Sequence, residues 1–129
     1  MENITVEQIV EACPLLYRRC KYLEVKEGWL PMIYELSKQL EDLIAKLTLD
    51  EQKDCYAVQV KEKFGSLRFY MSCSSKAMDE LIDNSEEMSV RVCEYCAKPG
   101  ETVIVMNWHH TYCDDCLRKS LDNKQILIK

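Results

Sequence analysis

Four cysteines in the C-terminal part of the chain have the type and the spacing of metal ligands. Two residues separate Cys93 from Cys96, two separate Cys113 from Cys116, and sixteen lie between the pairs. Structural Zn²⁺ is bound by four such side chains in a tetrahedron, so these residues predict one structural zinc ion per chain. Two disulfides or four unrelated buried thiols are the alternatives. Because residues 93–129 are too few to bury a self-sufficient core, metal binding would also supply folding free energy.

The residues around the two pairs indicate the fold of this module. Residues 97–100 (AKPG) have the composition of a tight turn, and residues 102–106 (TVIVM) that of a short apolar strand. Asp114 and Asp115 favour the N-terminus of a helix at the second pair. A knuckle, a hairpin and a second knuckle that enters a helix together make a treble clef, and a zinc ribbon is the alternative.

Two adjacent histidines, His109 and His110, come shortly before the second pair. We expect neither to bind the metal, because four cysteines complete a tetrahedral shell and adjacent side chains of an extended segment point in opposite directions. Together with Asp114 and Asp115 they form the only candidate catalytic cluster. A nuclease of the His-Asn-His type also has paired knuckles, but its histidines need more chain between the pairs than this sequence offers.

The composition limits the class of protein. The chain has 129 residues, a formal net charge of −5 and eight cysteines. This length predicts one domain, or one domain with a small zinc appendage. The first ten residues lack the apolar core of a signal peptide, and no apolar run could span a bilayer, so we expect a soluble, cytoplasmic protein without a membrane partner. Cysteines without a disulfide framework agree with a reducing compartment, and an acidic chain is a poor general ligand for nucleic acid.

Two helices are expected in the first fifty residues. The first starts at a capping box formed by Thr5 and Gln8 and is limited or kinked by Pro14. The second is long and follows Pro31, and residues 50–54 then form a polar connection. Its apolar stripe, with spacings of three and four, comprises Ile33, Leu36, Leu40, Leu43 and Leu47. We expect the stripe to pack within the chain, although the same spacing would suit a dimer seam.

Residues 55–73 predict an antiparallel hairpin that turns at Phe64 and Gly65. Apolar residues alternate along both strands, and one register places all of them on the same face. The cross-strand pairs in that register are Val60–Phe69, Val58–Met71 and Tyr56–Cys73. Cys55 then points away from Cys73, so neither a second metal site nor a disulfide is expected between them.

The opposite face of this hairpin is expected to be basic. Lys61 lies opposite Arg68 in the predicted register, and like charges that face each other across strands cost stability. An unfavourable pairing of like charges that the fold does not require indicates a functional site. We therefore expect this face to bind an anionic partner, either an acidic protein surface or a phosphate backbone. The residues expected to bind it are Lys61, Lys63, Arg68 and Tyr70. The alternative is neutralisation by acids of the chain itself, for example Glu80, Glu86 or Glu87.

Several strings of the sequence resemble a group of small uncharacterised bacterial and bacteriophage proteins. The strings are QVKEKFGSLRFY at residues 59–70, Gly28-Trp29 before the long helix, CEYCAKPG and TYCDDC. Members share a VKEKFG-x-LRFY hairpin followed by a helix and a four-cysteine cluster. The resemblance implies a zinc-binding protein from a phage, prophage or bacterial genome, and it implies no established activity. This chain has Ala97 where the pattern would have glycine, which alters the turn but removes no ligand.

The order of the expected elements is that of an α+β protein, with helices packed on a small antiparallel hairpin or sheet and a C-terminal treble-clef or zinc-ribbon-like module. Residues 1–90 would form the body from two helices, the hairpin and a third helix capped by Ser75. Residues 91–122 would form the zinc module, and residues 123–129 a tail. Because no flexible linker precedes Cys93, we expect the module to dock on the body.

Three classes of function agree with these features. The favoured one is a non-enzymatic adaptor or inhibitor that acts by protein–protein interaction, because the sequence has binding surfaces but no convincing catalytic constellation. The second is a nucleic-acid-binding protein that modulates transcription. The third is an enzyme built on the histidine cluster. A monomer and a homodimer are both compatible with the sequence.

Overall fold

A computed structural model describes the backbone of residues 3–20 and 22–128, and the side chains of residues 3–20 and 23–122. Its helices are α1 (Val6–Ala12), α2 (Pro14–Tyr17), the 3₁₀ turn η1 (Glu27–Trp29), α3 (Leu30–Ala45), α4 (Leu49–Lys53), α5 (Lys76–Ser89) and α6 (Asp114–Ile128). Its strands are β1 (Tyr22–Glu24), β2 (Ala57–Lys63), β3 (Ser66–Met71), β4 (Glu101–Val105) and β5 (Trp108–Tyr112). The predicted α+β class is confirmed. Within these described ranges, no helix is long and apolar enough to cross a bilayer.

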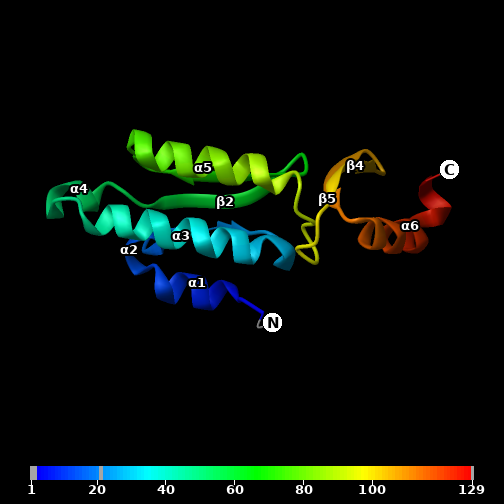
Figure 1. The fold of residues 1–129 in the computed structure, drawn as a ribbon, viewed down its shortest axis with the longest axis horizontal. Helices are drawn as coiled ribbons and strands as arrows, with labels where there is room; N and C mark the ends of the chain where they lie inside the picture. Colours follow the sequence, from blue (N-terminus) through cyan, green and yellow to red (C-terminus); the bar gives the residue numbers. More distant parts are fainter. Residues whose placement is uncertain (1–2, 21, 129) are drawn as a thin grey trace.

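The body is built around a three-stranded sheet in the order β1-β2-β3. Figure 1 shows α3 and α5 running alongside β2, with α1 beyond α3 and the β4–β5 hairpin and α6 at the other end of the molecule. One apolar cluster joins the helices to the sheet, and it includes Ile33, Leu40, Val60, Phe69 and Ile82. Burial of this cluster supplies the main stabilisation of the body, at about 25 cal/mol for each Å² of apolar surface removed from water.

The long helix α3 follows the predicted apolar stripe, with one change. Ile33, Leu36 and Leu40 are buried, Leu43 and Leu47 are partly buried, and Ile44 is fully buried. The helix ends at Ala45, so Leu47 packs on the core from the segment that follows. The stripe therefore packs within the chain.

The hairpin register is confirmed near the turn and wrong farther from it. Val60 pairs with Phe69, as predicted, and Lys61 pairs with Arg68. A β-bulge between Ala57 and Gln59 then shifts the pairing, so that Ala57, not Val58, lies opposite Met71. Ala57 is buried and Val58 is 43% exposed. An extra residue in one strand moves every later side chain to the other face of the sheet, which simple alternation of apolar residues does not show.

Strand β1 and helix α4 lie where the sequence analysis placed no element. Strand β1 pairs in parallel with β2, with Leu23 opposite Val60 and Glu24 opposite Lys61. Helix α4 replaces the expected polar connection and begins at a capping box in which the Thr48 hydroxyl accepts from the Glu51 backbone N–H. A Thr-x-x-Glu signal was visible for α4. A three-residue parallel strand has no comparable signal, because its partner lies far away in the chain.

Helix α5 protects the outer edge of β3. The Ser89 hydroxyl accepts from the Leu67 backbone N–H at 2.9 Å, and the Glu86 carboxylate accepts from the Phe69 N–H at 3.0 Å. These bonds satisfy edge donors that would otherwise be open to pairing with another strand. Glu86 therefore serves the fold rather than neutralising Lys61 or Arg68.

Candidate metal centre

The first cysteine pair lies on a tight turn that follows α5. The Ala97 backbone N–H donates to the Cys93 carbonyl at 3.0 Å, and the Cys93 N–H donates to the Lys98 carbonyl at 2.7 Å. Ala97 has a φ of 70°, a left-handed conformation that costs a non-glycine residue about 1 kcal/mol. The turn thus has the backbone conformation that glycine would adopt at this position. The Ala97 methyl group makes that conformation strained.

The second pair is positioned by the start of α6. Cys113 directly precedes the helix and Cys116 lies in its first turn, so both side chains face back toward the knuckle. The Cys116 backbone N–H donates to the Cys113 sulfur at 3.4 Å, and this bond lowers the pKa of the Cys113 thiol to about 7. Burial raises the pKa of Cys96 and of Cys116.

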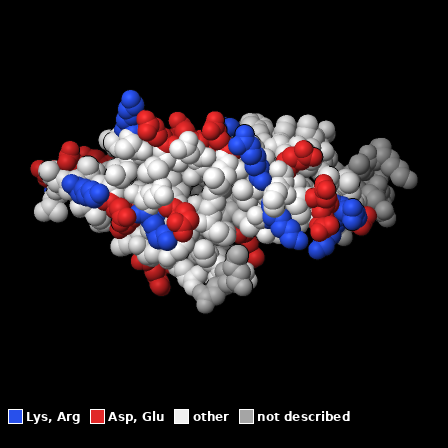
Figure 2. All heavy atoms as spheres, in the orientation of Figure 1, with Lys and Arg blue, Asp and Glu red and all other residues white. Residues whose placement is uncertain are grey.

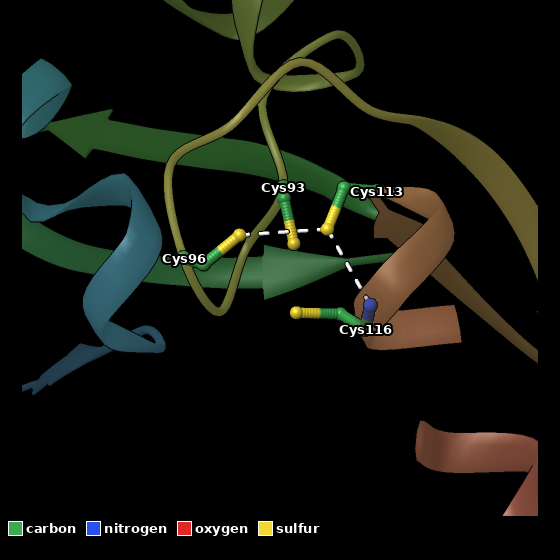
Figure 3. Close-up of side chains that lie close together, drawn as sticks. All are labelled: Cys93, Cys96, Cys113 and Cys116. Carbon is green, nitrogen blue, oxygen red and sulfur yellow. Dashed lines mark hydrogen bonds between the residues drawn. The ribbon is translucent and has the colours of Figure 1, made fainter. Parts of the chain in front are cut away.

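The structure brings the four predicted ligands together. Figure 3 shows the sulfurs of Cys93 and Cys96, from the knuckle, and of Cys113 and Cys116, from the start of α6, grouped around one centre. All four lie within 4.8 Å of one another, and the Cys96 and Cys113 sulfurs are 3.5 Å apart. A tetrahedron with Zn–S bonds of about 2.3 Å has sulfur–sulfur edges of about 3.8 Å. The cluster therefore has the size of a four-coordinate metal site.

A small apolar cluster packs beside the sulfurs. Its buried members are Cys93, Val105, Tyr112 and Cys113, with Val103, Cys116, Leu117 and Leu121 partly buried around them. Three of these eight residues are cysteines of the four-cysteine cluster, and three others, Val103, Val105 and Tyr112, belong to the β4–β5 hairpin. A cluster this small supplies little stabilisation by burial alone, and an ion held by the four cysteines would add to it.

Hydrogen bonds to backbone carbonyls connect the module to the body. The Gly28 N–H donates to the Glu94 carbonyl at 2.8 Å, and the Trp29 indole N–H donates to the Val92 carbonyl at 2.8 Å. At a second contact, the Thr111 hydroxyl donates to the Gly65 carbonyl at 2.6 Å. The Gly-Trp pair therefore forms part of the surface on which the first knuckle rests. The sequence analysis gave these two residues no structural role.

Glu94, inside the first knuckle, is a buried acid that the sequence analysis missed. Its side chain is 1% exposed, and one carboxylate oxygen lies 2.9 Å from His110 Nδ1 and 3.4 Å from Lys26 Nζ. The other oxygen accepts from the Thr111 backbone N–H at 3.2 Å. A buried carboxylate is costly unless it is paired in this way. Glu94 thus joins the knuckle, strand β5 and the body, and no local sequence signal marks it.

The two histidines have different surroundings, as expected for neighbours on a strand. His110 contacts Glu94 and stacks on Tyr112 with ring centroids 4.7 Å apart, whereas His109 meets Phe64 edge-on at 5.7 Å. Asp115 is close to Lys98 and Arg118 on the surface. His109, His110 and Asp115, three members of the candidate catalytic cluster, therefore each contact different residues.

The four residues predicted to bind a partner lie on the face of the sheet opposite the core. Lys61 pairs across strands with Arg68, Gln59 with Tyr70, and Lys63 with Ser66 beside the turn. Within residues 3–20 and 23–122, Lys61, Lys63 and Arg68 form no ion pair with an acid. The structure instead places Glu24, on the unpredicted strand β1, next to Lys61 in the sheet.

Comparison with known proteins gives no relative from which a function could be transferred. No protein-family model matches the chain, and no curated protein and no solved structure is significantly similar to it. The function must therefore be argued from the metal centre and the surface alone.

Proposed function

We propose that this is a non-enzymatic zinc-binding accessory protein, an adaptor or inhibitor that acts by binding another protein. The four clustered cysteines carry the first half of this proposal. Four thiolates around a tetrahedral ion leave no position for water or substrate, and this donor set is typical of structural zinc. The order of knuckle, hairpin and helix supports a module of the treble-clef type. By the resemblance of its motifs, the protein would come from a bacterial or phage genome.

The uncovered face of the body sheet carries the second half of the proposal. Lys61, Lys63 and Arg68 lie together there without ion pairs among the described residues, and Tyr70 beside them is 43% exposed. Side chains of like charge that oppose each other across strands lower stability. An acidic protein surface would supply the missing opposite charge. Tyrosine and arginine, two of the four residues of this face, are also enriched at protein–protein interfaces.

The turn of the hairpin adds an exposed aromatic ring to this face. Phe64 has a φ of 55° and is 64% exposed, with Lys63 Nζ 5.7 Å from its ring centroid. A bulky residue in the left-handed region costs stability, and Asn or Gly would suit this turn better. A strained, solvent-exposed phenylalanine next to unpaired cations is best explained by a contact with a partner.

The charge elsewhere on the molecule favours a protein over nucleic acid as the partner. Figure 2 shows acidic side chains in a row over α5, where Asp79, Glu80, Asp83 and Glu87 are exposed. With a formal net charge of −5, the chain repels a long polyanion, whereas a compact acidic patch on a protein can meet the basic face alone. Nucleic acid remains the second candidate because the face combines cations with aromatic rings.

Reversing the charge of the basic face is expected to abolish partner binding. In affinity capture from bacterial lysate, the wild type should retain a stoichiometric protein that survives nuclease treatment and is lost with Lys61→Glu/Arg68→Glu. The matched control is Lys46→Glu/Lys76→Glu, which makes the same change in charge at two exposed lysines away from this face. Capture that disappears with nuclease would make nucleic acid the partner. Equal capture by both double variants would contradict a role for the basic face.

Replacing Phe64 with asparagine is expected to separate stability from binding. Asparagine tolerates positive φ, so Phe64→Asn should raise the free energy of unfolding by about 0.5–1 kcal/mol. The same change removes the exposed ring and should weaken capture of the partner. Urea denaturation and the capture assay measure the two effects. A variant that is less stable and still captures the partner would show that the ring serves the fold, through its contact with His109.

A further inference from the structure

Two cysteines and a methionine line one cavity at the far end of the hairpin from the turn. Because of the bulge in β2, Cys55 does not point away from Cys73 as the simple register predicted. The Ser72 backbone N–H donates to the Tyr56 carbonyl at 2.9 Å, which extends the strand pairing beyond Ala57 and Met71. The Cys55 thiol then donates to the Cys73 carbonyl at 3.3 Å. The two cysteines are thus neighbours at the open end of the hairpin.

A third sulfur comes from α5. Met78 is buried, and its Sδ lies 3.7 Å from the Cys55 Sγ. Two sulfurs that each lie about 2.3 Å from one ion, at the tetrahedral angle, are about 3.8 Å apart, which is close to the distance observed here. Cys55, Cys73 and Met78 all line one cavity of about 280 Å³, together with Glu51 and Asp54. The cavity is open to solvent and Cys73 is exposed, so an ion could enter from that side.

The donor set selects the kind of ion. Two thiols and a thioether are soft ligands, which prefer soft d¹⁰ ions such as Cu(I), whereas Mg²⁺ and Ca²⁺ require oxygen ligands. Zinc would find only two strong donors among these three sulfurs, because thioethers are absent from its usual ligand sets. We propose that Cys55, Cys73 and Met78 form a second metal site, distinct from the four-cysteine centre, for a thiophilic monovalent ion of the Cu(I) type.

The alternative for two neighbouring cysteines is a disulfide, and the surroundings of Cys55 disfavour it. Cys55 is 4% exposed, and burial raises the pKa of its thiol. A buried protonated thiol reacts slowly with disulfides and oxidants because the thiolate is the nucleophile. A soft ion displaces the thiol proton as it binds, so the bound state has thiolate–metal bonds and the released protons pass to solvent.

Anaerobic titration of the zinc-loaded protein with Cu(I), followed by native mass spectrometry, tests this site. The first equivalent of Cu(I) is expected to add to the chain while zinc remains bound. Cys73→Ser, at an exposed position, and Met78→Leu, which preserves apolar volume, should each lower the Cu(I) affinity in competition with a chromogenic chelator. We expect the affinity for Cu(I) to fall at least about tenfold in each variant. Removing a residue that only hydrogen-bonds to a metal ligand already lowers metal affinity by this order.

The control variants are Cys20→Ser and Met88→Leu, which change the same residue types outside the cavity and should leave the Cu(I) affinity unchanged. Circular dichroism should show that all four variants fold. The proposal is overturned if the first Cu(I) expels zinc instead of adding to it, or if Cys73→Ser and Met78→Leu bind Cu(I) as the wild type does. Isolation of the native protein with a Cys55–Cys73 disulfide would also overturn it.

Discussion

Replacing Cys93 with serine is expected to abolish stoichiometric zinc binding and to unfold the C-terminal module. Cys93 is fully buried, and it contributes one of the four clustered sulfurs and the first turn of the knuckle. Structural zinc sites supply on the order of 10 kcal/mol to folding, far more than the small apolar cluster around Tyr112 can replace. Native mass spectrometry should give zero zinc per chain, and amide hydrogen exchange should show loss of protection in β4, β5 and the start of α6.

The matched control is Cys73→Ser, which removes an exposed cysteine outside the four-cysteine cluster and should keep one zinc per chain. Because the thiols must lose their protons to bind zinc, the apparent affinity of the wild type should fall as the pH is lowered. A Cys93→Ser protein with a protected module and no metal would show that the cluster is not a structural zinc site.

Local patterns predicted the parts of the fold that local chemistry determines. The stripe on α3 and the capping box at Thr5 depend on residues three or four positions apart, and both are present. The cysteine spacing likewise predicted which four sulfurs would meet. In each case the partners lie within one element or in two short segments with a recognisable spacing.

The missed features all depend on partners that are distant in the sequence. The bulge at Val58 shifts the β2–β3 pairing by one residue, and Cys55 then lies beside Cys73. Strand β1 is too short to show a pattern of its own. From the sequence alone, Glu94 would be predicted to be a solvent-exposed acid. Its burial is explained by β5 and Lys26, which pack around it in the folded protein.

The contact between the body and the knuckle leads to the second large expected effect. Gly28 is buried, and a Cβ atom at this position would lie 2.2 Å from the Cys93 carbonyl oxygen and 2.6 Å from the Glu94 carbonyl carbon. Both are backbone atoms of the first knuckle, which cannot move without displacing Cys93 from the four-cysteine cluster. Gly28→Ala should therefore push the module away and break the hydrogen bonds from Gly28 to Glu94 and from Trp29 to Val92. We expect the free energy of unfolding to fall by about 3 kcal/mol, which is the upper end of the usual cost of overpacking a protein interior.

Three measurements distinguish this effect from loss of the metal. Gly28→Ala should still bind one zinc per chain, because its four cysteines are unchanged, whereas Cys93→Ser should bind none. The Trp29 indole N–H, which donates to Val92 in the wild type, should exchange rapidly with solvent in the variant. Urea denaturation should show the lowered stability, and Glu27→Ala, at the exposed neighbouring position in η1, should stay within about 0.5 kcal/mol of the wild type. A Gly28→Ala protein with wild-type stability and a protected indole would mean that the module does not rest on this turn. The Gly-Trp pair would then need another explanation.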